Sequence, residues 1–433
     1  MKRTDQRYRE YVEILNRELV PAMGCTEPIT IAYAAAKARE TLGALPQRVK
    51  VEASGNIIKN VKSVVVPNTN HLKGIEAAAA AGIIAGDAGR VLEVLSAVSE
   101  AQKAAIADYL AQNVIEVCRA QSDYVFDIAV TVWAGADEAR VRIAHYHTNI
   151  VLIEKNGEKL MDQMLDCYRE PEQEKADQPE DCLNIEEIID FANSLAVEDV
   201  KPVLQRQAQY NMAIAEEGLR GNYGANIGRV LLKTYGERVS NRAKAKAAAA
   251  SDARMSGCEL PVVINSGSGN QGITASVPVI EYAREMGVGE DKMYRALALS
   301  NLVAIHQKRC IGTLSAYCGA VSAGGAAGAG IAYLHGGGLK EIAHTLVNCL
   351  AITSGIVCDG AKSSCAAKIA VAIDAAILGY AMYEDGQQFR AGEGIIKKGV
   401  EATISSVGRL GKVGMRETDN EIIRIMINAE EEG

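Results

Sequence analysis

The sequence predicts an α+β N-terminal domain followed by a larger all-α domain. The chain has 433 residues, more than one hydrophobic core usually serves. Strand-like alternation of apolar and polar residues occurs only before residue 160, whereas helical periodicity dominates the remainder. Aromatic residues make up only 5% of the chain, against 40 glycines. We therefore expect a core of small, closely approaching helices.

The pattern divides the chain into four consecutive segments. A helical segment at 1–45 precedes an α+β domain at 46–165. The stretch at 166–184 is rich in charge and holds two prolines, which is typical of a solvated linker rather than of a binding tail. Residues 185–433 are expected to form one helical domain, and no internal repeat is visible.

Two helices are expected before the first strand. Apolar residues at helical spacing predict an amphipathic helix over 8–19, which ends before Pro21. A second helix is expected over 29–41, with Thr26 as a plausible N-cap.

The α+β domain is expected to hold strands on both sides of a helical region at 71–112. Asn156-Gly157 follows the last strand and is a strong hairpin signal. The strand-like runs lie at 49–52, 64–66, 124–133, 140–147 and 150–154.

Beyond residue 185, helical runs are separated by glycines and the two-residue period of strands is absent. Such runs are expected to pack together around one core. They span about 202–219, 225–254, 289–308, 313–334, 339–354, 362–380 and 393–407.

Composition excludes several classes of protein. With 46 basic and 54 acidic residues the net charge is −8, so nucleic-acid binding is not expected. No apolar segment typical of a secretory signal follows the first residues, and we expect a cytoplasmic location. The stretch at 311–339 lacks charge but is mostly Ala, Gly and Ser, which favours a buried helix over a membrane span.

The ten cysteines are unusual for a chain so poor in aromatic residues. Cytoplasmic thiols stay reduced, so five disulfides are not expected. No C-x-x-C pair occurs, which argues against a zinc ribbon or a thioredoxin-type site. Most of these cysteines are expected to be small buried hydrophobic residues, and any metal site must gather thiols from distant parts of the chain.

Cys25 is a candidate for a reactive thiol. It stands directly before the second predicted helix, whose positive dipole end favours a thiolate. The neighbouring Glu27 opposes this effect because it adds negative charge. A structural role for Cys25 therefore remains an alternative.

Three late cysteines, Cys318, Cys358 and Cys365, lie within two residues of glycine or serine. Thiolates that meet in a helical core, with no histidine nearby, suit iron–sulfur ligation better than catalytic zinc. Three ligands would leave one iron open to act as a Lewis acid. The spacing alone does not choose among these cysteines and their competitors, which are Cys258, Cys310 and Cys349.

A glycine-rich segment at 265–272 precedes a helix and can form an anion-binding turn, with Ser266, Ser268 and Asn270 as candidate substrate-binding residues. A plain flexible connection is the alternative. Lys362 could hold a substrate carboxylate or cap a turn. In a strand-like run, His145, His147 and Asn149 could present polar groups on one face, although structural histidines are more common.

Three motifs together resemble a known family. They are Met-Gly-Cys-Thr-Glu-Pro at 23–28, Leu-Ser-Ala-Tyr-Cys-Gly at 314–319 and Cys-Asp-Gly-Ala-Lys-Ser-Ser-Cys-Ala at 358–366. Over nearly the full chain, the sequence resembles the L-cysteine desulfidase family, which is related to the iron–sulfur L-serine dehydratase α domain. The resemblance implies a serine-dehydratase-α-like helical bundle in the larger domain.

The resemblance also implies an activity and its residues. The family splits L-cysteine into pyruvate, ammonia and sulfide with a 4Fe–4S cluster and without pyridoxal phosphate. Its cluster ligands correspond to Cys318, Cys358 and Cys365, and its N-terminal cysteine corresponds to Cys25, as base, as ligand or as both. The loop at 266–272 resembles the substrate loop of the dehydratases more loosely. A small amino acid is the expected substrate, and a homo-oligomer the expected assembly.

Three alternatives remain open. Serine could replace cysteine as the substrate of an iron–sulfur deaminase. Ser268-Gly269-Asn270 resembles a turn of pyridoxal-phosphate lyases, but the surrounding region lacks the β/α alternation of that fold. A non-enzymatic regulatory protein could bind cysteine or a metal with the same thiols.

Overall fold

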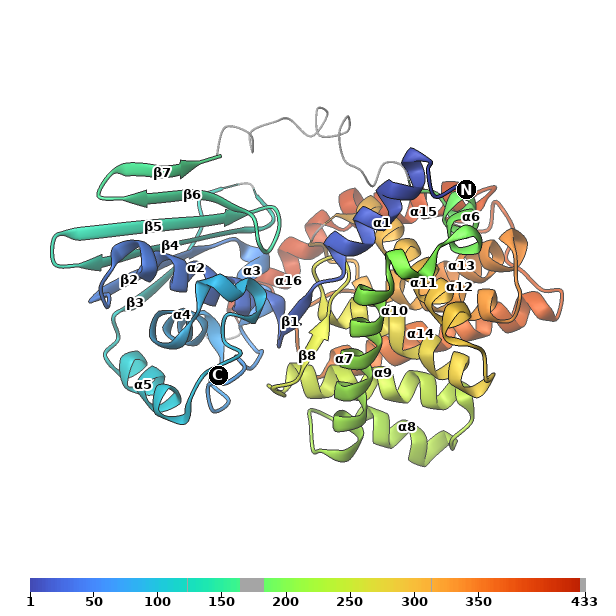
Figure 1. The fold of residues 1–433 in the computed structure, drawn as a ribbon, viewed down its shortest axis with the longest axis horizontal. Helices are drawn as coiled ribbons and strands as arrows, with labels where there is room; N and C mark the ends of the chain where they lie inside the picture. Colours follow the sequence, from blue (N-terminus) through green and yellow to red (C-terminus); the bar gives the residue numbers. More distant parts are fainter. Residues whose placement is uncertain (123, 164–182, 313, 429–433) are drawn as a thin grey trace.

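The N-terminal region contains a mixed six-stranded sheet with the strand order β3-β2-β4-β5-β6-β7 (Figure 1). The computed structural model describes residues 1–122, 124–163, 183–312 and 314–428. β2 pairs in parallel with β3, and every other neighbouring pair in this sheet is antiparallel. The strands are β2 (Arg48–Ala53), β3 (Ile115–Arg119), β4 (Asp127–Ala134), β5 (Asp137–Ala144), β6 (Ile150–Lys155) and β7 (Glu158–Asp162).

Small residues allow helices to pack closely beside this sheet. Helix α2 packs against β4 and β5, and α4 packs on α2. A Cβ atom added to Gly82 of α4 would collide with the backbone of Ala32 in α2, so glycine is required at this crossing. The helices of this region are α2 (Thr26–Leu42), α3 (Gly55–Val61), α4 (Gly74–Ala85), the 3₁₀ helix η1 (Ala88–Glu93) and α5 (Glu100–Ala111).

The larger region is a helical bundle arranged around α12, which contacts α10, α11, α13 and α14 (Figure 1). Helix α1 (Gln6–Glu18) packs on this bundle, where Tyr8 and Tyr11 contact the ring of Phe191. The bundle comprises α6 (Ile185–Ser194), η5 (Val197–Asp199), α7 (Lys201–Arg220), α8 (Ile227–Tyr235), α9 (Val239–Met255), α10 (Gly269–Glu285), α11 (Glu290–Ile311), α12 (Gly319–Leu334), α13 (Leu339–Thr353), α14 (Ser364–Glu384), α15 (Val400–Arg409) and the π-helical η6 (Leu410–Gly414).

Two pairings of secondary-structure elements help to join the regions. The short strand β1 (Pro21–Met23) pairs antiparallel with β8 (Pro261–Val263), which brings the segment before Cys25 beside the glycine-rich loop. At the other end of the chain, α16 (Arg416–Asn428) packs on α3. The C-terminal helix of the chain therefore returns to the N-terminal region.

The α+β region followed by a larger helical region agrees with the predicted fold class, with several local differences. The run at 64–66 is no strand, because only an isolated bridge joins Val65 to Lys73. Cys25, rather than Thr26, is the N-cap of α2. Gly236 has a φ of +78° and divides the predicted run at 225–254 into α8 and α9.

Other elements were missed or lie elsewhere. The sequence did not predict β1, β3, β8, α3, α6 or α16, and α15 begins at Val400 rather than near residue 393. Residues 166–182 of the predicted linker lie outside the described residues. The four-segment division itself stays a prediction.

The charge-free stretch at 311–339 contains the buried helix α12, in agreement with the sequence. Within the part of the chain that the structure describes, one helix, α14, is long and apolar enough to cross a bilayer by length and composition. Half of its most apolar window is buried in the protein, and core helices of soluble proteins pass the same test.

Candidate functional site

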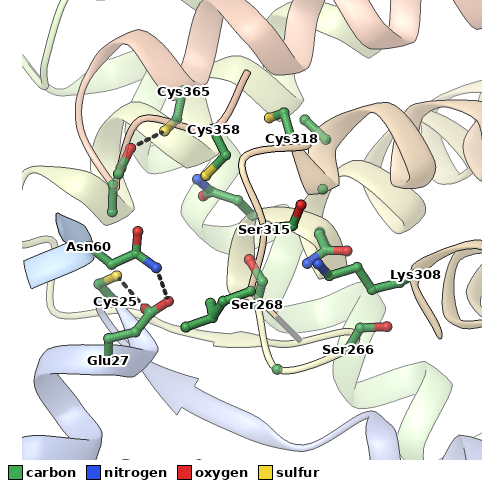
Figure 2. A pocket seen from close by; sticks show the side chains of 18 of the residues that line it. Cys25, Glu27, Asn60, Ser266, Ser268, Lys308, Ser315, Cys318, Cys358 and Cys365 are labelled. Atoms are coloured by element: carbon green, nitrogen blue, oxygen red, sulfur yellow. Dashed lines mark hydrogen bonds between the residues drawn. The ribbon is translucent and has the colours of Figure 1, made fainter. Parts of the chain in front are cut away.

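A pocket lies where the α2 end of the N-terminal region meets the helical bundle (Figure 2). Its empty space is about 820 Å³ when the part that opens to solvent is included. Seven of the eight residues that the sequence predicted for the site line this pocket: Cys25, Ser266, Ser268, Asn270, Cys318, Cys358 and Cys365.

Backbone pairing places Cys318 and Cys358 together. Cys318 is the N-cap of α12, and Cys358 lies in the loop between α13 and α14. The Cys318 amide donates to the Ile356 carbonyl at 3.1 Å, and the Cys358 amide donates to the Ala316 carbonyl at 2.6 Å. These two bonds tie the loops antiparallel to each other, so their thiols share one side of the pocket.

A turn brings the third thiol to the same side. Gly360 has a φ of +92°, which favours glycine, and an added Cβ would lie 2.5 Å from the Lys59 carbonyl oxygen. Cys365 follows in the first turn of α14. Figure 2 shows Cys318, Cys358 and Cys365 along one side of the pocket, with Cys25 and Glu27 across from them.

The three thiols are electrostatically coupled. Burial, reinforced by the Cys358 and Cys365 thiols, raises the pKa of Cys318 to about 12. Burial and the nearby Cys358 also raise the pKa of Cys365. Soft, closely spaced thiols of this kind are the donors of iron–sulfur clusters, whose positive irons stabilise the thiolate form.

No three His, Cys, Asp or Glu side chains among the described residues converge tightly enough to hold a single metal ion. Cys318, Cys358 and Cys365 instead face a common space. Ligands around a shared space suit a cluster of several irons better than one ion, since each thiolate binds a different iron. The donor set therefore fits a cluster held by three cysteines.

Across the pocket, Cys25 is 2% exposed and donates a hydrogen bond from Sγ to Glu27 Oε2 at 3.1 Å. Burial, together with the negative charge of Glu27, raises the pKa of the Cys25 thiol well above its ordinary value. The sequence predicted that the helix N-terminus would favour the thiolate form of Cys25, and this prediction is wrong in this structure. Desolvation outweighs the helix dipole here.

Glu27 is the buried carboxylate of the pocket. Thr26 donates to its Oε2 at 3.1 Å and Asn60 donates to its Oε1 at 2.9 Å. Burial would raise the pKa of Glu27, but the nearby His147 and the Cys25 hydrogen bond outweigh it and hold the pKa below its ordinary value. The pair thus rests as a thiol beside a carboxylate.

The glycine-rich loop forms the floor beside these groups. Ser266 and Gly267 have φ values of +49° and +75°, and Ser268 is the N-cap of α10. Asn270 accepts a hydrogen bond from Arg254 Nη1 at 3.1 Å. An added Cβ on Gly267 would lie 2.6 Å from the His147 ring, so the loop rests closely on that histidine. The loop is therefore a packed part of the pocket.

Lys362 does not line the pocket, contrary to the sequence prediction. Its Nζ pairs with Asp359 Oδ1 at 2.6 Å and donates to the Asp359 carbonyl at 2.9 Å, so it stabilises the turn instead. His147 lines the pocket, whereas His145 and Asn149 do not. Of the three polar residues that were expected on one strand face, only His147 therefore lines the pocket.

The sequence missed most of the polar groups in the pocket. Its three cationic residues come from three different helices, α3, α9 and α11. Two of the missed polar groups carried a signal: Glu27 lies two residues from Cys25, and His147 lies in the strand-like run of polar residues described above. The polar pocket residues that were not predicted as site residues are Glu27, Lys59, Asn60, His147, Arg254, Gln271, Lys308, Ser315 and Tyr317.

A mixed sheet joined to a helical bundle, with a thiol-lined pocket between them, defines a protein built to act on a small molecule. Residues 89–424 match the serine dehydratase alpha chain family. The chain belongs to this family, whose members are lyases of the dehydratase type.

Full-length relatives bear the name UPF0597 protein, which specifies no reaction. The protein of Desulfitobacterium hafniense is 61% identical over 433 residues, covering 99% of both chains. That of Lachnoclostridium phytofermentans is 51% identical over 97% of this chain and 100% of its own. That of Treponema denticola is 45% identical over 97% of this chain and 98% of its own.

Proposed function

We propose that this protein is an L-cysteine desulfidase that depends on a 4Fe–4S cluster and converts L-cysteine to pyruvate, ammonia and sulfide. One observation carries the proposal: three thiols from separate loops and helices line one pocket opposite a fourth thiol, Cys25. Membership of the serine dehydratase alpha chain family supports lyase chemistry. The motif resemblance favours cysteine over serine.

In this proposal, Cys318, Cys358 and Cys365 hold the cluster. Their position in one pocket wall supports this role, as does the closeness by which an ionised Cys358 raises the pKa of Cys318 and of Cys365. When bound, the cluster would supply an open iron as a Lewis acid that activates the substituent on Cβ. Lys59 supports this wall from α3, since its Nζ donates to the Cys358 carbonyl at 3.4 Å and pairs with Asp419 at 2.5 Å.

The reaction is a β-elimination that needs no net oxidation. A base removes the proton from Cα, the Cβ–S bond breaks, and sulfide leaves with the electron pair. The resulting aminoacrylate tautomerises and reacts with water to give pyruvate and ammonia. Cys25 and Glu27 are proposed to act together as the base. As the Cys25 sulfur takes the Cα proton, the thiol proton passes to Glu27 along their existing hydrogen bond, so no free thiolate has to form first.

The pocket would exclude bulk water from this chemistry. Cys25 and Glu27 are both buried, and Ser268 and Asn270 lie beside them on a packed loop. These loop residues are proposed to contact the substrate. We further propose that the enzyme acts in the cytoplasm as a homo-oligomer, without nucleic-acid or membrane partners.

Anaerobic purification followed by iron and acid-labile sulfide assays tests the cluster. Sulfide release from L-cysteine, compared with pyruvate formation from L-serine, tests the substrate. Stoichiometric iron with sulfide release is expected. Iron well below one atom per chain after reconstitution would contradict the cluster, and turnover of serine alone would assign the protein as a deaminase, the activity that the family name favours.

The same preparation distinguishes the remaining alternatives. A cluster gives a broad visible absorption that bleaches in air, whereas pyridoxal phosphate gives a band that hydroxylamine removes. A protein that binds iron but turns over neither amino acid would be a regulatory or binding protein.

A further inference from the structure

Lys308 is a buried cation that lines the pocket. It lies in the last turn of α11 and is 6% exposed. Its side chain extends toward the pocket interior (Figure 2). Within residues 1–122, 124–163, 183–312 and 314–428, its ammonium group forms neither a hydrogen bond nor an ion pair.

The other cations that line the pocket are already engaged. Lys59 pairs with Asp419 at 2.5 Å. Arg254 donates to Asn270 at 3.1 Å. The Nε–H of Arg254 is buried without a hydrogen-bond partner, so part of its donor capacity is open as well. Among the described residues that line the pocket, Lys308 is the cation that forms neither a hydrogen bond nor an ion pair.

The carboxylate in the pocket is engaged as well. Glu27 accepts hydrogen bonds from Cys25, Thr26 and Asn60 and forms no ion pair with Lys308. A buried ammonium without a counter-ion is costly, and a bound anion would remove that cost.

We propose that Lys308 binds the α-carboxylate of the amino-acid substrate. The inference rests on the proposed function only in taking the ligand to be an amino acid. Ammonium and carboxylate form strong charge-assisted hydrogen bonds. Every α-amino acid carries this carboxylate, so Lys308 selects the class of substrate, and other groups select the leaving group. Lys308 thus takes the role that the sequence suggested for Lys362.

Calorimetric titration of the anaerobic holoenzyme with two probes tests this assignment. L-Alanine carries the carboxylate but no leaving group, and cysteamine carries the thiol and amine but no carboxylate. In Lys308→Met, the Kd for L-alanine should rise about 10- to 100-fold, whereas the Kd for cysteamine should not change. Lys292→Met, at an exposed position of the same helix, should leave both unchanged.

Activity gives a second readout. Lys308→Met should raise KM for L-cysteine by a similar factor at unchanged iron content, and Lys308→Arg should restore part of the affinity. Lys308→Gln is the alternative neutral variant should the Met variant fold poorly. The proposal would be overturned if the Kd values for L-alanine and cysteamine rose equally, or if neither rose.

The two hypotheses fail in different ways. Wild-type protein that binds L-alanine through Lys308 but releases no sulfide from L-cysteine would contradict the desulfidase function and support the carboxylate site. If the wild-type protein releases sulfide from L-cysteine and Lys308→Met leaves the KM unchanged, the desulfidase function is supported and the carboxylate site is contradicted.

Discussion

The Cys25 thiol donates a hydrogen bond to the Glu27 carboxylate, with 3.1 Å between Sγ and Oε2. Both groups are buried on the side of the pocket opposite the other three thiols. The bond keeps the proton of Cys25 within reach of a carboxylate whose pKa lies below its ordinary value. This arrangement separates the role of Cys25 from that of the remaining cysteines.

Cys25→Ala should therefore lose turnover while retaining iron. Removing a proton-transfer group costs about 10²- to 10⁴-fold in kcat. Iron and acid-labile sulfide should stay at the wild-type level because the proposed cluster ligands are the three other thiols. Loss of iron together with activity would show that Cys25 is a ligand instead.

Alanine substitution of Cys318, Cys358 or Cys365 should instead lower the iron and acid-labile sulfide content of reconstituted protein. Each thiol faces the shared space in the pocket, so none can replace another. Cys118→Ala is the matched control, because Cys118 lies on β3 in the sheet and away from the pocket. Full iron content in Cys358→Ala would disprove this ligand set.

Short sequence motifs made it possible to predict that Cys318, Cys358 and Cys365 belong to one site. In the segments around Cys318 and Cys358 to Cys365, the ligand-type residues stand next to the glycines that shape the turns, so chemistry and local geometry occur together in the sequence. Lys308 had no such signal, since a lysine near the end of a helix is typically solvated. Its burial comes from tertiary packing, because α11 packs against α10, α12 and α15 among other elements.

The errors have a similar physical origin. β1 and β8 are three residues each, too short for a visible period, and they form only because distant segments pair. The three valines at 64–66 have the β-branched side chains typical of a strand. They are buried in the core but lie in no sheet. Lys362 was chosen for its closeness to Cys365 in sequence, but the turn at Gly360 directs it to Asp359.

Gly272→Ala should destabilise the protein. Gly272 lies in α10 directly against β8, and an added Cβ would collide with the Val263 carbonyl oxygen. Overpacking of this kind costs about 1–3 kcal/mol, which a urea denaturation midpoint reports. Gly355→Ala is the control, because nothing lies within 4 Å of its added Cβ. Equal midpoints for the two variants would show that β8 can shift at little cost.

Glu401 should make the folding stability of the protein depend on pH in the acidic range. Its carboxylate accepts a hydrogen bond from His306 Nε2 at 2.7 Å and another from the Ile185 amide at 2.7 Å. Burial alone would raise the pKa of Glu401, but these bonds hold it below its ordinary value of 4.5. The pKa is therefore lower in the folded than in the unfolded state, so the carboxylate stabilises the fold above about pH 4.5.

That contribution is lost as pH falls through the folded-state pKa, when Glu401 takes up a proton. Glu401→Gln should lower the melting temperature near neutral pH and should make it less sensitive to acid below about pH 5. Thermal unfolding from pH 7 down to about pH 3 measures both effects. Glu421→Gln removes the same charge from an exposed position on α16 and should follow the wild-type curve. Parallel curves for wild type and Glu401→Gln would show that the pair with His306 adds no pH-dependent stability.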